Sequence, residues 1–327
     1  MKRILIINLA FIGDVLLSTP VARALRHAYP QARIDMMTVP VAAPLAQRNP
    51  YVDEVIVYDK KGQHKKWKAI WQLIQQVRKR KYDLAVCTNF APRGAMLAFF
   101  CGIPRRIGYA AQHGEWFLTD AVSAVRKEIR HEAENYLDVL APLGLCATDT
   151  SLELQLDSCD YAHVPEKAKE KQRVVLCPAG RNPLRSWTLE GYQALLRAFP
   201  GVEWFLVGGK ENKEYLQEIA STMVSPDHVY AGTHELSEVA ALFKGADAIV
   251  SVDTALLHIS QAVKTPVVGL FGPGDPRVWG PRGAHDKLIW LNNCPPCANR
   301  KDCPDNRCMK EIPADLVIQA VKDVLQR

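Results

Sequence analysis

Short apolar runs alternate along this chain with stretches whose hydrophobic residues recur at helical spacing. The first run covers 2–9, and strands are also expected at 33–39, 52–58 and 82–88. Between them, 14–28, 41–47 and 65–80 have the spacing of amphipathic helices. This alternation predicts a parallel sheet with helices on both faces.

The pattern restarts after a polar, proline-containing segment at 157–172. Strands are expected at 173–177, 202–208, 248–252 and 266–271. Helices are expected at 188–198, 213–222, 237–243, 255–263 and 313–325. We therefore expect an α/β protein with two similar domains, 1–160 and 161–327, a linker near 160–172, and a ligand crevice between the domains at the carboxyl ends of the strands.

Length, composition and charge narrow the class of protein. A chain of 327 residues with 48% hydrophobic residues has room for about two domains, and no apolar run is as long as a transmembrane helix. The start of the chain resembles a signal peptide, but Asn8, Gly13 and Asp14 interrupt the apolar run, so we expect a cytoplasmic protein. The net charge of +6, without a nucleic-acid motif, indicates an acidic substrate or surface and no nucleic-acid partner.

The cysteines are nine in number, and five of them stand singly in apolar segments, which suits a reducing compartment. The other four gather near the carboxyl end as Cys294, Cys297, Cys303 and Cys308. Their spacing lacks a second C-x-x-C, and Pro295, Pro296 and Pro304 constrain the loop. Reduced thiols, a disulfide and a bound metal all remain open for this cluster.

The segment 246–276 is the strongest candidate for a ligand site. A strand ends at Val252, Asp253 and Thr254 form a turn, and a helix follows. Backbone N–H groups at the start of that helix are unpaired, and the helix dipole favours an anion there. After the next strand, the loop that begins at Gly272 lets backbone approach a ligand closely. The two loops together predict a phosphate-bearing ligand.

Two further strand-to-helix loops carry charged residues. Arg181 and Arg185 lie in the loop 178–187, where their forked donors match phosphate oxygens, although solvated surface charges would give the same pattern. Glu211 follows the glycine pair 208–209 and is a candidate for binding ribose hydroxyls or, equally, an acid at a helix start.

Asp14 is a single carboxylate at the end of the first strand. The glycine turn around Gly13 has neither the G-x-G-x-x-G pattern of a dinucleotide site nor a G-x-x-x-x-G-K-[ST] phosphate loop, so a nicotinamide cofactor loses support. Asp14 is either an acid that caps the following helix or a general base facing the second domain.

The segment 60–81 holds nine Lys or Arg residues and no acid. Its apolar residues have helical spacing and form one stripe, made of Trp67, Ile70, Trp71, Ile74 and Val77. The stripe packs on the core beneath solvated charges, or the basic helix meets an anionic membrane surface or a phosphorylated acceptor. Both can hold at once.

Several of these motifs occur in the order and spacing of one known family. They are Gly13-Asp14-Val15-Leu16 with Thr19-Pro20, Arg185-x-Trp187, Asp253-Thr254-x-x-x-His258 and Gly272-Pro273-x-Asp275-Pro276. Asn49-Pro50-x-Val52-Asp53-Glu54-Val55 and Gly102-Ile103-Pro104-x-Arg106-x-Gly108 extend the match to essentially the whole chain. The chain resembles the ADP-heptose:lipopolysaccharide heptosyltransferases, glycosyltransferase family nine.

The resemblance implies a GT-B fold with two Rossmann-like domains. The first domain would bind the acceptor and the second the donor. It implies inverting transfer of heptose from ADP-heptose to the inner core of lipopolysaccharide, with no required metal or cofactor, by an enzyme peripheral at the anionic inner-membrane surface. Asp14 would be the base, and the donor would be held by Arg181, Arg185, Glu211, Asp253, Thr254, His258 and Gly272. Acceptor or membrane contacts would come from Lys60, Lys61, Lys65, Lys66 and Arg106.

The chain departs from the family pattern at two positions, with Ala255 where glycine is common and Gly274 where threonine is common. The Ala255 methyl group pushes against a diphosphate, and Gly274 lacks a hydroxyl donor, so the donor's identity stays open. The alternatives are transfer of another nucleotide sugar or to another acceptor, and a nucleotide-sugar binding protein without turnover.

Overall fold

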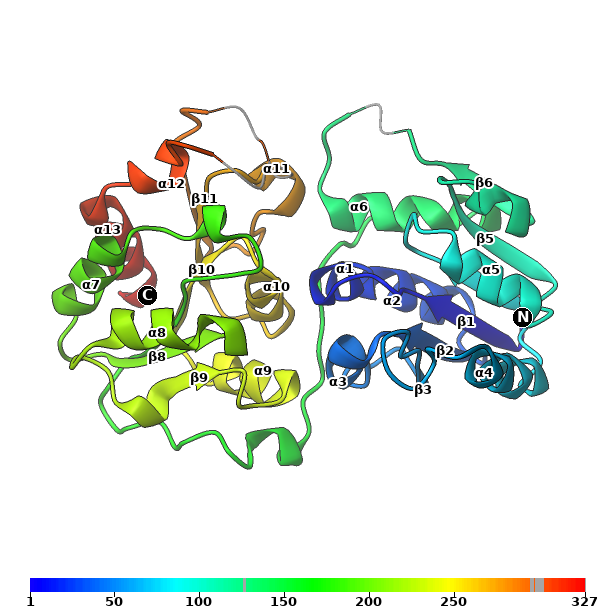
Figure 1. The fold of residues 1–327 in the computed structure, drawn as a ribbon, viewed down its shortest axis with the longest axis horizontal. Helices are drawn as coiled ribbons and strands as arrows, with labels where there is room; N and C mark the ends of the chain where they lie inside the picture. The colour runs from blue at the N-terminus through cyan, green and yellow to red at the C-terminus, as the bar shows by residue number, and fades with distance from the viewer. Residues whose placement is uncertain (126–127, 295–296, 298–302, 327) are drawn as a thin grey trace. The chain divides into compact units, whose positions relative to one another are not determined.

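The structure is a computed structural model that describes residues 1–125, 128–294, 297 and 303–326. The chain divides into two compact units, Met1–Gln155 and Leu156–Arg327. Residues 156–160 therefore belong to the second unit, where the short helix η4 (Ser158–Tyr161) contacts α9 (Leu236–Lys244). Figure 1 follows the chain through both units.

The first unit is a parallel sheet of six strands in the order β3-β2-β1-β4-β5-β6. Its strands are β1 (Arg3–Ile7), β2 (Arg33–Thr38), β3 (Glu54–Val57), β4 (Leu84–Cys87), β5 (Arg105–Ala110) and β6 (Asp120–Ser123). Its helices are α1 (Ile12–Leu17), α2 (Thr19–Ala28), α3 (Ala43–Ala46), α4 (Trp67–Lys79), α5 (Arg93–Phe100) and α6 (Glu132–Leu137).

The second unit repeats this architecture in the order β12-β11-β10-β7-β8-β9. Its strands are β7 (Arg173–Cys177), β8 (Glu203–Gly208), β9 (Val229–Ala231), β10 (Ala248–Val252), β11 (Val267–Phe271) and β12 (Lys287–Trp290). Its other helices are α7 (Leu189–Ala198), α8 (Lys213–Ala220), α10 (Ala255–Ala262), α11 (Pro276–Trp279), α12 (Arg307–Lys310) and α13 (Ala314–Leu325).

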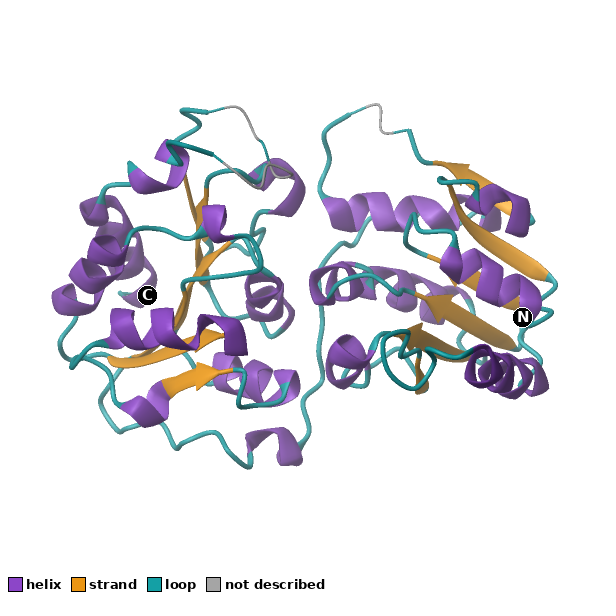
Figure 2. Ribbon diagram, in the orientation of Figure 1, coloured by secondary structure: helices purple, strands orange, loops and turns teal. Residues whose placement is uncertain are grey.

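Both sheets have the strand order of a Rossmann fold, because each is wound outward in two directions from a central pair of strands. The central strands are fully buried: Ile4 to Ile7 in β1 and Ile249, Val250 and Val252 in β10 are all 0% exposed. Apolar side chains on both faces explain why these strands read as continuous hydrophobic runs. Figure 2 shows the helices that flank the strands of each unit. The predicted α/β architecture is confirmed.

The prediction of one continuous helix over 14–28 is wrong, because the structure has two helices there. The stretch 14–28 is divided into α1 and α2 at Ser18, whose hydroxyl bonds the carbonyl of Val15 at 2.8 Å. Pro20 lies in the first turn of α2, where its missing N–H group has no helical partner to lose. Gly13, expected in a turn, lies within α1.

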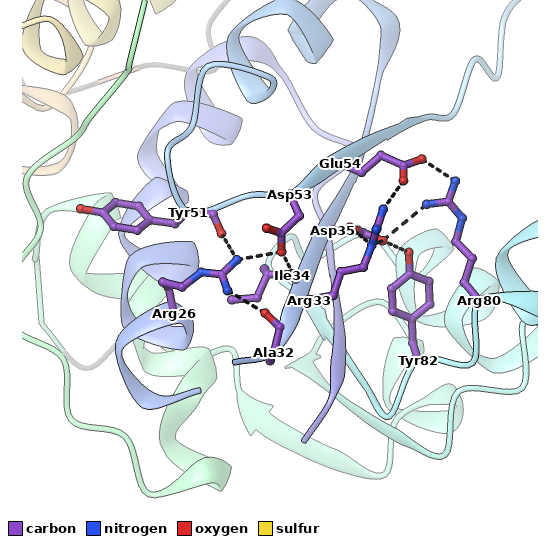
Figure 3. Close-up of polar contacts among 10 residues, drawn as sticks. All are labelled: Arg26, Ala32, Arg33, Ile34, Asp35, Tyr51, Asp53, Glu54, Arg80 and Tyr82. Atoms are coloured by element: carbon purple, nitrogen blue, oxygen red, sulfur yellow. Dashed lines mark hydrogen bonds and ion pairs between the residues drawn. The ribbon is translucent and has the colours of Figure 1, made fainter. Parts of the chain in front are cut away.

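A polar network fixes the amino-terminal end of the first sheet (Figure 3). Asp35, 0% exposed, accepts from Arg33 Nε at 3.1 Å and lies 3.4 Å from Nη1 of Arg80, and it also accepts the hydroxyl of Tyr82. Glu54 pairs with both arginines. The opposite, carboxyl ends of the strands are where ligand sites form in open α/β sheets.

The same network explains one motif of the family resemblance. Asp53 accepts the N–H of Ile34 and a bond from Arg26, each at 2.7 Å (Figure 3). Asn49 is buried and accepts the N–H of Tyr51 at 2.9 Å. The segment 49–55 thus ties β3 to β2 and has a structural role.

No helix in the described part of the chain combines the length and the apolar character needed to cross a bilayer.

Candidate functional site

Each sheet has one place where the strand order reverses direction, between β1 and β4 in the first unit and between β7 and β10 in the second. In open α/β sheets, ligands bind outside the carboxyl ends of the strands at such a reversal. Asp14 follows β1, while Arg185 follows β7 and Asp253 follows β10. The strongest candidates from the sequence therefore lie after strands that border these two places.

The Asp14 carboxylate is half-buried in the first turn of α1 and has a donor on each oxygen. Its Oδ2 accepts the N–H of Phe11 at 3.2 Å, so the helix-start contact is confirmed. Its Oδ1 accepts the hydroxyl of Tyr136 in α6 at 2.7 Å. Beneath it, the buried side chain of Asn8 donates to the Asp14 carbonyl at 3.1 Å and fixes the loop. Neither carboxylate contact excludes proton transfer, because each oxygen retains a second lone pair.

Tyr136 is 4% exposed. Burial, followed by the charge of Asp14, raises the pKa of its hydroxyl well above the usual value. The hydroxyl therefore stays protonated and donates a hydrogen bond to the carboxylate. Tyr136 has no local signal in the sequence, since 122 residues separate it from Asp14.

In the second unit, Arg185 connects the loops after β7 and β10. Its Nη1 donates to the carbonyl of Asp253 at 2.9 Å and lies 3.2 Å from Oδ2 of the same residue. Among the described residues, neither Nε of Arg185 nor Oδ2 of Asp253 has a hydrogen-bond partner, and the approach to Oδ2 is an ion-pair contact only. Burial raises the pKa of Asp253, and Arg185 partly opposes this rise.

Two glycines let neighbouring loops approach Asp253 and Thr254 closely. A Cβ atom on Gly274 would lie 2.1 Å from Oδ2 of Asp253, and one on Gly180 would lie 2.5 Å from Cγ2 of Thr254. Thr254 itself is the N-cap of α10, because its hydroxyl accepts the N–H of Leu256 at 3.2 Å. In this structure the loop at Gly274 lies close to the Asp253 carboxylate, which would have to move to admit a larger residue.

The loop that carries Arg185 is anchored at both ends. Asn182 accepts the N–H of Leu184 at 3.0 Å, and the buried indole of Trp187 donates to the carbonyl of Ile312, also at 3.0 Å. This explains the Arg-x-Trp motif, since the tryptophan holds the backbone from which the arginine extends.

The remaining donor candidates differ in exposure. Arg181 and Glu211 are exposed, and His258 is 3% exposed, with Nδ1 3.3 Å from Oε1 of Gln261. A Cβ atom on Gly272 would lie 2.5 Å from Sδ of Met309, so this glycine also admits α12. Contacts of these four residues with a donor stay predictions.

The basic segment is a helix only from Trp67 to Lys79, as α4, so the predicted helix start at Lys65 is two residues early, and the apolar stripe is divided in its exposure. Ile74 and Val77 are buried, whereas Trp67 is 84% and Trp71 56% exposed. The four candidates Lys60, Lys61, Lys65 and Lys66 are also exposed. The core-packing interpretation therefore holds for Ile74 and Val77, and binding of a membrane surface or an acceptor by the exposed residues stays a prediction.

Arg106 has a structural role that the sequence did not indicate. Its Nε donates to the carbonyl of Phe117 at 2.6 Å and its Nη1 to the carbonyl of Ile103 at 2.5 Å. Its guanidinium also lies over the ring of Phe99, 5.4 Å from the centroid. A direct contact with an acceptor stays a prediction.

All nine cysteines are free thiols, so no disulfide joins the four near the carboxyl end. Cys294 accepts from Nε of Arg307 at 3.2 Å and Cys303 from the N–H of Asn306 at 3.3 Å. Burial raises the pKa of Cys308 to about 11. Pro295 and Pro296 lie outside the described residues. Among the described residues, potential metal-ligand atoms lie within 4.8 Å of one another at Asp157, Cys159 and Asp160. The four thiols near the carboxyl end are not part of that group.

Residues 70–307 match the family described as glycosyltransferase family 9 (heptosyltransferase). The chain is 28% identical to lipopolysaccharide heptosyltransferase 3 of Escherichia coli K12, covering 96% of this chain and 95% of the relative. It is 25% identical to lipopolysaccharide heptosyltransferase 2 of the same strain, covering 88% of each. The solved structure of E. coli ADP-heptose LPS heptosyltransferase II superposes with a TM-score of 0.83 at 24% identity, covering 100% of this chain and 99% of that one.

Proposed function

The chain belongs to glycosyltransferase family 9, and we propose that it transfers a heptose from ADP-heptose to the inner core of lipopolysaccharide. Support comes from its similarity over nearly its whole length to two lipopolysaccharide heptosyltransferases. The observation that carries most weight is the contact of half-buried Arg185 with buried Asp253 at the strand-order reversal of the second unit. Among the described residues, Oδ2 of Asp253 and Nε of Arg185 are buried polar atoms without a hydrogen-bond partner, and such atoms are costly unless a ligand supplies one.

The donor is assigned to the second unit. The diphosphate would lie at the start of α10, where N–H groups and the helix dipole favour negative charge, with Arg185 as its cationic ligand. Both contacts of Arg185 with Asp253 use Nη1, which leaves the other side of the guanidinium fork for phosphate oxygens. Arg181, Glu211, His258 and Gly272 are the further donor contacts that we propose.

The acceptor and the base are assigned to the first unit. Asp14 takes the proton of an acceptor hydroxyl while the hydroxyl oxygen bonds to the anomeric carbon of the heptose. The bond from that carbon to the diphosphate oxygen breaks on the opposite face, and ADP leaves with the electron pair. The configuration at the anomeric carbon is therefore inverted. Arg185 and the α10 N–H groups stabilise the charge on ADP, so we propose that no divalent metal is required.

The enzyme is proposed to work at the anionic surface of the inner membrane. Trp67 and Trp71 are exposed next to lysines of the segment 60–68, and tryptophan is enriched where a bilayer meets water. A second apolar group lies on α5, where Met96, Phe99 and Phe100 are 37–47% exposed. Helices α4 and α5 pack in one core cluster over the same sheet, so these residues belong to one layer of the first unit.

The activity is tested with purified protein, ADP-heptose and lipopolysaccharide that lacks core heptose. We expect ADP release that requires the acceptor, a mass increase of one heptosyl group on the acceptor, and an inverted anomeric centre by NMR. The same rate is expected in excess EDTA. Donor binding without ADP release would identify a binding protein, turnover with another nucleotide sugar only would reassign the donor, and a strict need for a divalent ion would refute the metal-free step.

A further inference from the structure

We propose that Tyr136 is a positioning residue that holds the Asp14 carboxylate in the orientation required for proton abstraction. This inference rests on the proposed function, in which Asp14 is the base. Tyr136 would act through Asp14 and need not touch the substrate.

The two donors on Asp14 come from different parts of the first unit. Phe11 belongs to the loop that precedes α1, and Tyr136 to α6, which packs against α1 and α2. A carboxylate on a single loop contact can rotate about its last torsion, which is broad for aspartate. A second donor on the other oxygen, 2.7 Å away, fixes the plane of the group. General-base catalysis depends on such geometry, since the base must lie within hydrogen-bond reach of the proton that it abstracts.

Tyr136 is itself held firmly. The first turn of α6 is capped by Nδ1 of His131, which accepts the N–H of Ala133 at 3.3 Å. The hydroxyl of Tyr109 in β5 donates to the carbonyl of Asn135, the residue before Tyr136. Asn135 in turn donates to Oε2 of Glu132 at 3.1 Å. Strand β5 and helix α6 therefore place the hydroxyl against α1.

The groups that could titrate around this contact are few. Asp14, Glu132 and Tyr109 are the charged or ionisable neighbours that act on Tyr136. His131 caps the same helix, and on the neighbouring helix α2 Arg23 is engaged by Asp149 and Glu153. A hydrogen bond donated to a carboxylate favours its charged form. Losing the Tyr136 hydroxyl therefore removes a contact that stabilises the charged side chain of Asp14.

The test is the pH dependence of kcat for Tyr136→Phe. We expect kcat at neutral pH to fall about tenfold, the equivalent of one hydrogen bond to a charged group, with little change in the KM for ADP-heptose. We also expect the acid limb of the pH profile to move to higher pH. Site-specific 3-fluorotyrosine at position 136 keeps the ring and strengthens the donor, so it should move the acid limb the other way, and it serves as the test if the phenylalanine variant does not fold.

Tyr82→Phe is the matched control. Tyr82 is also a buried tyrosine of the first unit whose hydroxyl donates to an aspartate, Asp35, but it lies at the amino-terminal end of the sheet. It should lose stability without moving the acid limb. If Tyr136→Phe and Tyr82→Phe have the same pH profile, or if the fluorinated protein does not shift it, Tyr136 does not position the base.

Asp14→Asn separates this outcome from failure of the proposed function. If Asp14→Asn turns over at the wild-type rate, Asp14 is not the base and the proposed mechanism fails. If Asp14→Asn is inactive while Tyr136→Phe leaves kcat and the acid limb unchanged, Asp14 keeps its assignment as the general base and only the role of Tyr136 is overturned.

Discussion

Nη1 of Arg185 donates to the backbone carbonyl of Asp253 at 2.9 Å, across the place where the second sheet reverses its strand order. Arg185 belongs to the loop after β7 and Asp253 to the turn after β10, so the contact joins two loops that are 68 residues apart in sequence. The two side chains also form an ion pair at 3.2 Å, in which 26% of the Arg185 side chain and 7% of the Asp253 side chain is exposed. One arginine thus orders the turn that precedes α10 and adds positive charge to the start of that helix.

Replacing Arg185 with alanine should reduce turnover about 10²-fold or more, because a preorganised contact to the developing charge on ADP is lost. Arg185→Lys should recover part of the rate, since charge is restored without the fork. Steady-state kcat for ADP release measures the effect. Arg197→Ala, an exposed arginine on α7, is the control and should turn over like the wild type. Wild-type turnover of Arg185→Ala would mean that the donor phosphates bind elsewhere.

Asp253→Asn should separate stability from activity. Burial raises the pKa of the Asp253 carboxyl in the folded protein, so its charged form is disfavoured there. The raised pKa makes the free energy of unfolding more favourable to the folded state below about pH 4, the pKa of an aspartate in the unfolded chain. This contribution is lost as the pH rises through the pKa of Asp253 in the folded protein. A pKa difference of one corresponds to about 1.4 kcal/mol.

The amide cannot ionise, so the Tm of Asp253→Asn relative to wild type should become more favourable as the pH rises from about 4 to 7. Turnover should fall at every pH, because the loop loses its ion pair with Arg185. Thermal melts across this pH range, with ADP release on the same samples, measure both effects. A Tm difference that is independent of pH would show that Asp253 has the same pKa in both states.

Asp14→Asn should lower kcat about 10²–10⁴-fold while the protein still folds and binds ADP, because the amide keeps the size and the contact with Phe11 but cannot take a proton. Calorimetric ADP binding and a thermal melt accompany the rate measurement. If Asp14 serves only the helix start, activity should instead stay near normal and any loss should follow the change in Tm. Asp253 would then be the next carboxylate to test as base.

The sequence predicts the α/β class of both units because their central strands are apolar on both faces. It does not predict β5, whose run Arg-Arg-Ile-Gly-Tyr-Ala contains two arginines and a glycine. A Cβ atom on Gly108 would lie 3.0 Å from Cβ of Cys87, so the glycine serves close packing of β5 on β4. The edge strands β6 and β12 are equally hard to recognise, since their side chains are mostly part-exposed and lack a clear apolar pattern.

The candidate site was predictable where its residues share a local motif. Asp253 and Thr254 stand between a strand and a helix, and Asp14 follows the first strand, so the chemistry of a strand-to-helix loop identifies them. Long-range partners have no such signal. Tyr136 meets Asp14 only because α6 packs on α1, and the steric demand on Gly274 comes from a carboxylate 21 positions earlier in the chain.

The exposed tryptophans at the start of α4 and the exposed lysines in and just before it predict measurable binding to anionic lipid. Changing Lys60, Lys61, Lys65, Lys66 and Lys68 to Gln should weaken binding to phosphatidylglycerol vesicles by up to about 1 kcal/mol per charge, an effect that fades at high salt. Trp67→Ser with Trp71→Ser should weaken binding in a way that persists at high salt, because burial of an indole does not depend on ionic screening. Vesicle co-sedimentation at several salt concentrations distinguishes the two contributions.

The matched controls for α4 come from exposed residues of the second unit. Five lysines there have the same charge, namely Lys169, Lys171, Lys213, Lys310 and Lys322, and Leu288 and Leu316 are 47% and 45% exposed. Changing those lysines to Gln, or those leucines to Ser, should leave vesicle binding near the wild-type value if the α4 surface is specific. ADP binding should be unchanged in the α4 variants, since the donor is assigned to the other unit. If the α4 and control variants lose vesicle binding equally, the lysines of the basic segment are ordinary solvated charges. A general electrostatic attraction depends on the number of lysines and not on their position beside Trp67 and Trp71.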